Sequence, residues 1–420
     1  MAVPRAAFLY FSMVFVTIST AQEPGGSRSF VISPQFDSFI PRESVPVSER
    51  VDFNGGVSVL HDSFRNLEGS PAESGLLTVV DFGAGYSGGV PSGPGVSYSV
   101  NYGGRLFLED ESSSPSGNFD QNLGGDVKIR GGLTTVSIFG GFSQNSGNTV
   151  TRDLRLEEID RSSVSFRFGV SASRKMTRGT LNGGVASQSE VFDEDADGLA
   201  PSDRIRWAAD AGYFYDPPFL ARTDFGVGAT IGEESVNTSE DQTFFSPSFR
   251  TRWKMSDLTN FSAHIGVEQR SITSSEGEEF SATNQVWGMN LDWKARVRTT
   301  ITLSATRRVT PSIRIADSNQ ENTLIRLGVR QSIGEMWSAS VNYGFERSDY
   351  TNFRIGEDEE LEGQNLHQFG ATLGRNLYFD FLNMTGSASV FYNFRQREQR
   401  LAAFEFPDQH IYGVRLGFSF

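Results

Sequence analysis

"QHIYGVRLGFSF", residues 409–420, ends the chain in strict alternation. The apolar or aromatic positions are Tyr412, Val414, Leu416, Phe418 and Phe420, and the residues between them are small or charged. Because successive side chains of a strand point to opposite faces, this segment predicts a β-strand with one apolar and one polar face. A terminal strand of a water-soluble domain usually tapers into polar residues, so the apolar face indicates a different environment.

The same period-2 pattern recurs from Val51 onward. Examples are the alternating runs at 96–108, 164–170, 205–213, 261–267 and 337–345. Segments of this kind number about 18, with about 16 as the alternative, and an even number is typical of bacterial single-chain barrels. The sequence therefore predicts an all-β chain of antiparallel strands.

Composition indicates whether this all-β chain is soluble, disordered or embedded in a membrane. The chain has 420 residues, of which 44 are Gly, none is Cys and 12% are aromatic, while only 37% are hydrophobic. That apolar content is low for a soluble domain of this size, and the aromatic content is too high for a disordered chain. After residue 21 no window approaches ~18 consecutive apolar residues, so no transmembrane helix is expected. A closed transmembrane β-barrel remains, because it needs only every second residue to be apolar.

The N-terminal residues predict export. Arg5 precedes the apolar run 6–18, and small residues end the segment at Ala21, where we expect signal-peptide cleavage. Residues 22–49 contain four Pro residues and read as an irregular periplasmic leader, either disordered, docked on a periplasmic partner or folded into the lumen as a partial plug. Residues 50–420 are the predicted barrel. With no Cys, neither a disulfide nor a lipid-modified cysteine is expected.

The predicted connections alternate in length. Short ones fall at 216–218, 256–260 and 334–336, and longer polar segments fall at 109–121, 190–204, 231–242, 270–283, 308–322 and 347–364. In outer-membrane barrels, short turns face the periplasm and long loops face the outside. Both chain ends are then expected on the periplasmic side.

Residues between the apolar positions are expected to line a lumen, and bases outnumber acids among them. The predicted lining bases are Arg105, Arg130, Arg167, Arg206, Arg222, Arg250, Arg252, Lys254, Arg326, Arg330 and Arg415. The net charge of −14 must then come from acids elsewhere, chiefly in predicted outer loops such as 109–111, 193–197, 233–234, 276–279 and 357–362. A basic wall in a water-filled channel concentrates anions. The alternative is that each base pairs with an acid on a neighbouring strand and only holds the wall together.

An acidic segment, "DEDADG" at 193–198, offers a weak Ca²⁺ site. Asp193, Asp195 and Asp197 place carboxylates at alternate positions before a Gly, as oxygen-rich Ca²⁺ loops do. Arg204 stands where such a loop would carry a bidentate Glu, so an acidic surface loop is the alternative. No other cofactor is expected.

Enzymatic and nucleotide-binding signals are weak. His264 has Ser262 and Glu268 on its own strand face, but separations of ~7 and ~13 Å do not build a hydrogen-bonded triad within one strand. The Gly-rich stretches read as turns, and no phosphate-binding loop is present in the sequence. We expect neither an enzyme nor a nucleic-acid partner.

The final strand resembles the C-terminal signal by which the outer-membrane insertion machinery recognises barrels. "GVSVLHDSFRNLEG" at 56–69 and the ending "YNFRQREQR…DQHIYGVRLGFSF" resemble a β-barrel porin family often encoded beside exopolysaccharide export genes. The family tends to carry Asp-Asn in its first loop, where this chain has His61-Asp62-Ser63. The resemblance implies a pore in the outer membrane of a Gram-negative-type bacterium, in contact with lipid and lipopolysaccharide. It would pass small anionic solutes or serve as an exopolysaccharide conduit with periplasmic export components. A non-conducting structural or adhesive barrel is the alternative, followed by an outer-membrane enzyme.

Overall fold

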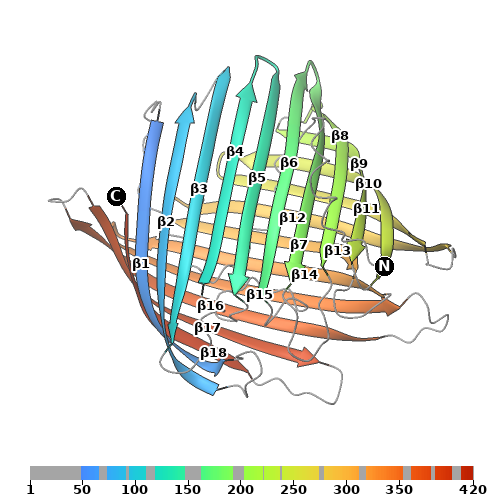
Figure 1. The fold of residues 1–420 in the computed structure, drawn as a ribbon. Coiled ribbons are helices and arrows are strands. Elements are labelled where there is room, and N and C mark those ends of the chain that lie inside the picture. The colour runs from blue at the N-terminus through green and yellow to red at the C-terminus, as the bar shows by residue number, and fades with distance from the viewer. Residues whose placement is uncertain are drawn as a thin grey trace, which may run out of the picture.

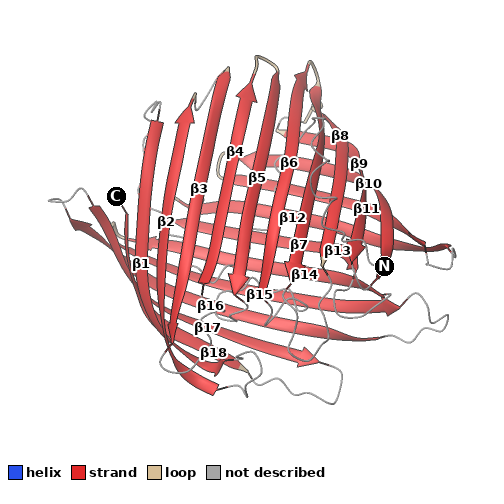
Figure 2. Ribbon diagram, viewed as in Figure 1, coloured by secondary structure: helices blue, strands red, loops and turns tan. Residues whose placement is uncertain are grey.

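A computed structural model describes residues 49–65, 73–90, 94–109, 119–146, 162–192, 203–220, 222–236, 239–273, 279–311, 318–352, 361–379, 384–399 and 408–419. Every regular element in these ranges is a β-strand (Figure 2). In the part of the chain that is described, no helix is long and apolar enough to cross a membrane. The predicted signal peptide and the leader up to residue 48 lie outside these ranges.

The strands follow one another with short gaps. They are β1 Glu49–Arg65, β2 Glu73–Gly89, β3 Gly95–Glu109, β4 Phe119–Arg130, β5 Thr134–Ser146, β6 Ser162–Met176, β7 Gly179–Phe192, β8 Arg204–Tyr215, β9 Thr223–Val236, β10 Ser239–Ser256, β11 Thr259–Thr273, β12 Glu279–Arg296, β13 Thr299–Pro311, β14 Ser318–Ile333, β15 Trp337–Asn352, β16 Leu361–Phe379, β17 Met384–Gln399 and β18 Gln409–Ser419.

These strands form a single closed sheet. Each strand pairs antiparallel with its sequence neighbours, and β1 pairs with β18, so the 18-stranded sheet has no free edge. In Figure 1 the steep strands β1–β8 form the wall nearer the viewer, and β12–β18 cross behind them. Strands on opposite sides of a tilted barrel cross in this way. The predicted all-β antiparallel barrel and its strand number are confirmed.

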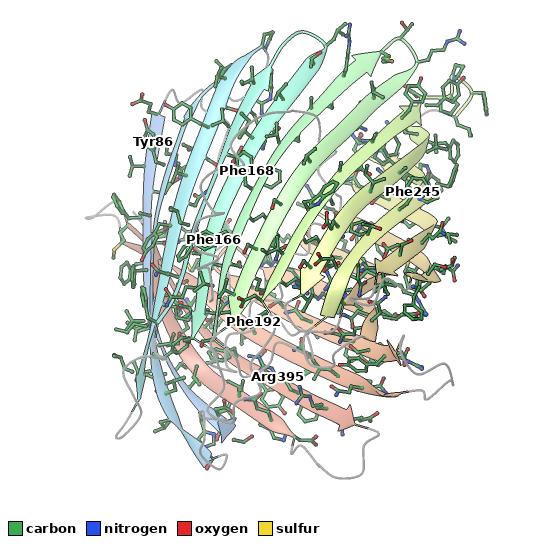
Figure 3. The ribbon with its side chains drawn as sticks, turned by 45° about the vertical axis from the view of Figure 1, so that its right-hand side comes forward. Tyr86, Phe166, Phe168, Phe192, Phe245 and Arg395 are labelled. Carbon is green, nitrogen blue, oxygen red and sulfur yellow. The ribbon has the colours of Figure 1, made fainter. Side chains whose placement is uncertain are left out.

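The two faces of the sheet differ in chemistry. Outward side chains are mostly apolar and exposed, and Phe166, Phe168 and Phe245 in Figure 3 are examples. Phe192 and Arg395, labelled in the same view, belong to the opposite face and are buried. We call this second face the inner wall. The alternation arises because each strand projects successive side chains to opposite sides of the pleat.

Connection lengths divide the barrel into two ends. At the turn end, strands are joined across 90–94, 131–133, 177–178, 216–222, 257–258, 297–298, 334–336 and 380–383. At the loop end, the gaps between strands are 66–72, 110–118, 147–161, 193–203, 237–238, 274–278, 312–317, 353–360 and 400–408. Glu49 and Ser419 both lie at the turn end, since β1 and β18 are antiparallel.

One predicted long loop is wrong. Residues 231–242 are almost entirely strand, because β9 continues to Val236 and β10 starts at Ser239. Glu233 and Glu234, which the sequence placed in an acidic outer loop, therefore lie on β9. Glu234 is on the inner wall and fully buried, while Glu233 accepts a hydrogen bond from the indole of Trp207, 3.0 Å away on the outer face. Several other long connections are also shorter than predicted, since strands extend into both ends of the polar segments.

Candidate functional site: the inner wall of the barrel

Four of the predicted lining bases are paired with carboxylates on the inner wall. Arg105 Nε lies 2.7 Å from Asp81 Oδ1, and Arg415 Nη2 lies 3.4 Å from the other oxygen of the same carboxylate. Arg250 makes a two-pronged contact with Asp210, and Arg252 stands 3.8 Å from Asp224. Register places Arg105 directly opposite Asp81 and Arg252 directly opposite Asp224. Arg250 and Arg415 instead reach diagonally across an intervening strand. For these four residues the structure supports the alternative in which each base pairs with an acid and holds the wall together.

Two predicted lining bases at the turn end share one carboxylate. Lys254, near the end of β10, lies 3.4 Å from Asp257 in the following turn. Arg222 precedes β9 instead of lying within a strand, and its φ of 70° places it in the left-handed region that a turn requires. It lies 3.7 Å from the same Asp257 carboxylate. Arg222 is therefore a turn residue at the mouth, which corrects its predicted place in the lining.

Arg130 and Arg167 are different, because among the described residues neither forms an ion pair with a carboxylate. Arg130 donates to the carbonyl of Val90 at 3.0 Å and to Ser97 Oγ at 3.1 Å. Arg167 is exposed, with its guanidinium 5.1 Å from the centre of the Phe139 ring. Arg167 therefore keeps its charge on the inner wall without a carboxylate partner in the described ranges, whereas Arg130, the last residue of β4, lies at the turn end. Arg206 rests on Phe244 at 5.1 Å, but its register partner is Glu234.

Arg326 and Arg330 occupy the inner face of β14. Their register partners are small or polar: Ser304 and Gly344 flank Arg326, while Thr300 and Ser340 flank Arg330. Arg330 is exposed and Arg326 is half-buried. The two therefore lie on the face that the sequence predicted.

Inward phenylalanine rings lie over glycines of the next strand, and arginine guanidiniums stack on these rings. A Cβ on Gly226 would stand only 2.8 Å from the Phe214 ring, and Arg252 lies 3.5 Å above that ring. Phe139 covers Gly169 in the same way, and Arg167 lies above it. Because the glycines leave room, the aromatic rings stay against the wall and do not project into the bore. The sequence could not predict this arrangement, since it depends on which glycine faces which ring across the strands.

A buried network of charged side chains lies at the loop end of β9–β11, and the sequence did not predict it. Arg270 has no exposed side-chain surface. Its Nε lies 2.6 Å from Glu268 Oε1, and its Nη atoms lie 3.4 Å from Glu234 Oε2. It also donates to Gln242 Oε1 at 3.0 Å and to the carbonyl of Val309 at 2.6 Å. Nearby, Arg204 is bound to Glu190 at 2.7 Å. Arg204 and Arg270 fell in predicted loops, so their strand positions were not recognised.

The closing seam between β18 and β1 is held by polar contacts above and below an apolar cluster. Gln409 donates to both carboxylate oxygens of Asp62 at 2.9 and 2.8 Å and accepts from Arg395 at 3.0 Å. Arg415 donates to Ser58 Oγ at 3.0 Å. Between these contacts lies a buried cluster of Leu60, Leu77, Val79, Phe107 and Ile411. Arg415 is thus buried in the seam, which removes it from any exposed lining.

The residues considered for enzymatic activity do not form a triad. His264 lies over Gly288 on the inner wall, and Arg250 is its register partner on β10. Glu268 is bound to Arg270 and not to His264. Ser262 is buried on the same face, two residues from His264.

Some predicted sites lie outside the described residues. These are Ala21, Phe420 and the acidic residues Asp193, Asp195 and Asp197. Within the ranges that are described, no group of three or more His, Asp or Glu residues could hold a metal ion. The other members of the predicted insertion signal, Tyr412, Val414, Leu416 and Phe418, are exposed on the outer face of β18.

Comparison with known proteins gives a likeness in general shape. No family model matches the chain, and no curated protein matches it. Among solved structures, OccAB2 of Acinetobacter baumannii aligns at 11% identity and a TM-score of 0.44, covering 90% of this chain and 99% of that one. OpdK of Pseudomonas aeruginosa, solved with vanillate, aligns at 11% and 0.44, covering 88% and 98%. The ferric enterobactin receptor PfeA of P. aeruginosa aligns at 11% and 0.42, covering 88% and 80%. Similarity at this level carries no information on substrate.

Proposed function

We propose that this protein spans a bacterial outer membrane and acts as a passive pore for small anionic solutes. The observation that carries the proposal is the opposite chemistry of the two faces. Apolar and aromatic side chains are exposed on the outside of a closed sheet, while arginines and their carboxylate partners occupy the inner wall. Lipid outside and water inside satisfy both faces at once.

The outer face supports a membrane location. Exposed residues such as Val57, Phe82, Phe168, Val227 and Leu416 recur around the barrel, whereas a soluble monomer rarely exposes an apolar patch beyond a few hundred Å². A closed sheet leaves no backbone group unpaired at an edge, which is what hydrocarbon demands. In this proposal the turn end faces the periplasm, and the exposed outer face of β18, from Tyr412 to Phe418, is the signal that the insertion machinery recognises.

Anion preference is proposed from the bases that lack a carboxylate partner among the described residues. Arg167 lies on the inner wall and Arg130 at its turn-end mouth, and low-dielectric walls focus the field of such charges. The paired bases contribute less, because their acids cancel most of the field. The channel is therefore expected to prefer anions modestly and to have no single tight site.

Planar-bilayer recording of the purified mature protein tests the proposal. In a KCl gradient the reversal potential should have the sign of anion preference, and R130Q/R167Q should move it towards zero. The matched control is R347Q, which removes an arginine paired with Asp349 on the outer face and should leave the potential unchanged. A cation-selective channel, or a selective channel indifferent to R130Q/R167Q, would refute the anion proposal.

Two other functions would give different recordings. An exopolysaccharide conduit is expected to need periplasmic export components and to stay closed when purified alone. A structural or adhesive barrel would conduct nothing under any condition. Steady conductance by the isolated protein would therefore exclude the adhesive barrel and argue against the conduit.

A further inference from the structure

Three of the four histidines of the chain stand where the outer face changes from apolar to polar. On β16, Phe369 is followed towards the loop end by His367 and then Asn365. On β18, Tyr412 is followed by His410, and on β1, Val59 is followed by His61 and Ser63. Each histidine is therefore the first polar outward residue beyond the apolar run of its strand. If lipid covers the apolar run, the histidines lie at the level of its polar headgroups.

Two of these histidines belong to nearly identical modules on consecutive hairpins. In the first, Tyr343 and Phe345 of β15 flank His367 of β16, with ring centres 6.3 and 5.0 Å away. The Tyr343 hydroxyl lies 3.0 Å from His367 Nδ1.

The second module repeats this geometry. Tyr392 and Phe394 of β17 flank His410 of β18 at 6.1 and 5.0 Å, and the Tyr392 hydroxyl lies 2.9 Å from His410 Nδ1. A third histidine, His61 on β1, stacks on Tyr412 with ring centres 5.0 Å apart. A repeat of ring distances and hydrogen bond on separate strands indicates a shared role.

Register places the three histidines at one height. His367 pairs with Gln396, and Phe394, two residues away on β17, pairs with His410. Tyr412, two residues beyond His410, pairs with His61. A line of constant height moves by roughly one residue per strand in a barrel tilted by ~40°. The turn end shows a shift in the same direction. Trp337, the first residue of β15, is in register with Arg375 on β16, and Arg375 is in register with Ala388, which lies inside β17 and not at its start.

Among the described residues, each module keeps one hydrogen-bond donor without a partner. If the tyrosine hydroxyl donates to Nδ1, the imidazole keeps its Nε2–H for another acceptor. If Nδ1–H donates instead, the tyrosine O–H is left to donate. Towards the loop end, Arg347 binds Asp349 and Glu398 accepts from Asn365 at 3.5 Å, while Asp408, exposed two residues before His410, makes no hydrogen bond to the module among the described residues. A phosphate oxygen of a lipid at this level would supply an acceptor for that donor.

We propose that the two Tyr–His–Phe modules, on β15–β16 and β17–β18, are binding sites for the phosphorylated headgroups of lipids in the loop-side leaflet. The aromatic rings provide a flat apolar contact for the upper acyl chain, and the His or Tyr donor binds a phosphate oxygen. Phosphate suits the site because it offers acceptors only and sits at the boundary between hydrocarbon and water. This inference rests on the proposed membrane location of the outer face.

Native mass spectrometry of the full mature chain in detergent micelles tests the proposal. The probe is phosphatidic acid, compared with phosphatidylcholine and with inorganic phosphate. The wild type should retain two molecules of phosphatidic acid more tightly than the remainder. Y343F/H367L and Y392F/H410L remove both possible donors of one module each, and each should weaken one of these events by about tenfold, as expected for the loss of a hydrogen bond to a charged group. The control is Y86F/Y98F, which removes two hydroxyls from the outer face at the turn end and should change neither event.

Three results would overturn the proposal: no preference for phosphatidic acid over phosphatidylcholine, unchanged binding in both double variants, or equal occupancy by inorganic phosphate alone. The last would assign the donors to a free anion and reject the lipid. Conductance of the same wild-type sample is measured in parallel. A conducting barrel without lipid preference would refute only the headgroup sites, whereas a protein that neither inserts nor retains lipid would refute the membrane location as well.

Discussion

Replacing Arg270 with methionine should destabilise the barrel strongly, because this side chain is the ion-pair partner of buried Glu268 and, with Arg206, one of the bases beside buried Glu234. Methionine preserves much of the side-chain length but none of the donors. It would remove the ion pair to Glu268 at 2.6 Å, the contacts to Glu234 at 3.4 Å and the hydrogen bond to the Val309 carbonyl at 2.6 Å. Glu234 has only 1% of its side chain exposed and Glu268 has 9%, so water cannot replace the lost partner.

The expected loss is about 3–5 kcal/mol in the free energy of unfolding, the cost typical of leaving a buried charge without its partner. Reversible urea unfolding in lipid vesicles, followed by tryptophan fluorescence, measures it. R270M/E234Q/E268Q should recover part of the loss, because it removes the stranded charges as well. The control is R347M, whose partner Asp349 is on the exposed outer face and whose loss should cost about 1 kcal/mol or less. If R270M lowered the free energy of unfolding by no more than R347M does, the buried contacts of Arg270 described above would be contradicted.

Two further pairs of substitutions test the packing of the inner wall and the assignment of the two faces. G232A should destabilise by about 1–3 kcal/mol, since a Cβ there would meet the Trp207 carbonyl and stand 2.6 Å from Phe244, whereas G132A has nothing within 4 Å and should be neutral in the same unfolding assay. L416R should cost about 2–4 kcal/mol and slow insertion into vesicles, because it puts a charge on the lipid-facing side, while N101R on the inner wall should insert as the wild type does. Equal stability of G232A and G132A would contradict the close packing at Gly232. Equal insertion of L416R and N101R would contradict the assignment of the two faces.

The fold could be predicted from the sequence wherever the two faces meet different solvents. Along β18 the apolar set from Tyr412 to Phe418 and the residues between them alternate without a break, so the strand and its outward face were evident. The same holds for β6, where Phe166 and Phe168 are exposed on the outer face. The even strand number followed from counting such segments.

Prediction failed near the loop end, and the reason is physical. Beyond the apolar band both faces of a strand are polar, so alternation disappears while the hydrogen-bonded ladder continues. Residues 231–242 therefore looked like a loop, and Glu234 and Arg270 were placed on a solvated rim although they are buried against each other. Only the register between β9, β10 and β11 reveals the network.

The pairing of the lining bases was also beyond the sequence. Nothing in the local pattern distinguishes Arg250, which is held by Asp210, from Arg167, which lies over Phe139 without a carboxylate partner among the described residues. Each occupies an inward position directly after an outward phenylalanine, Phe249 or Phe166. The difference arises from which residue the adjacent strand places at the same height, and that depends on register.

The location of the tryptophans gives the most direct measurement of whether the outer face meets lipid. All five lie on outward positions: Trp207, Trp253, Trp287, Trp293 and Trp337. In vesicles made with acyl-chain-brominated lipids, the account predicts strong quenching of their fluorescence and little quenching by aqueous acrylamide. Fluorescence that acrylamide quenches fully and brominated lipid leaves unchanged would contradict the membrane-spanning barrel.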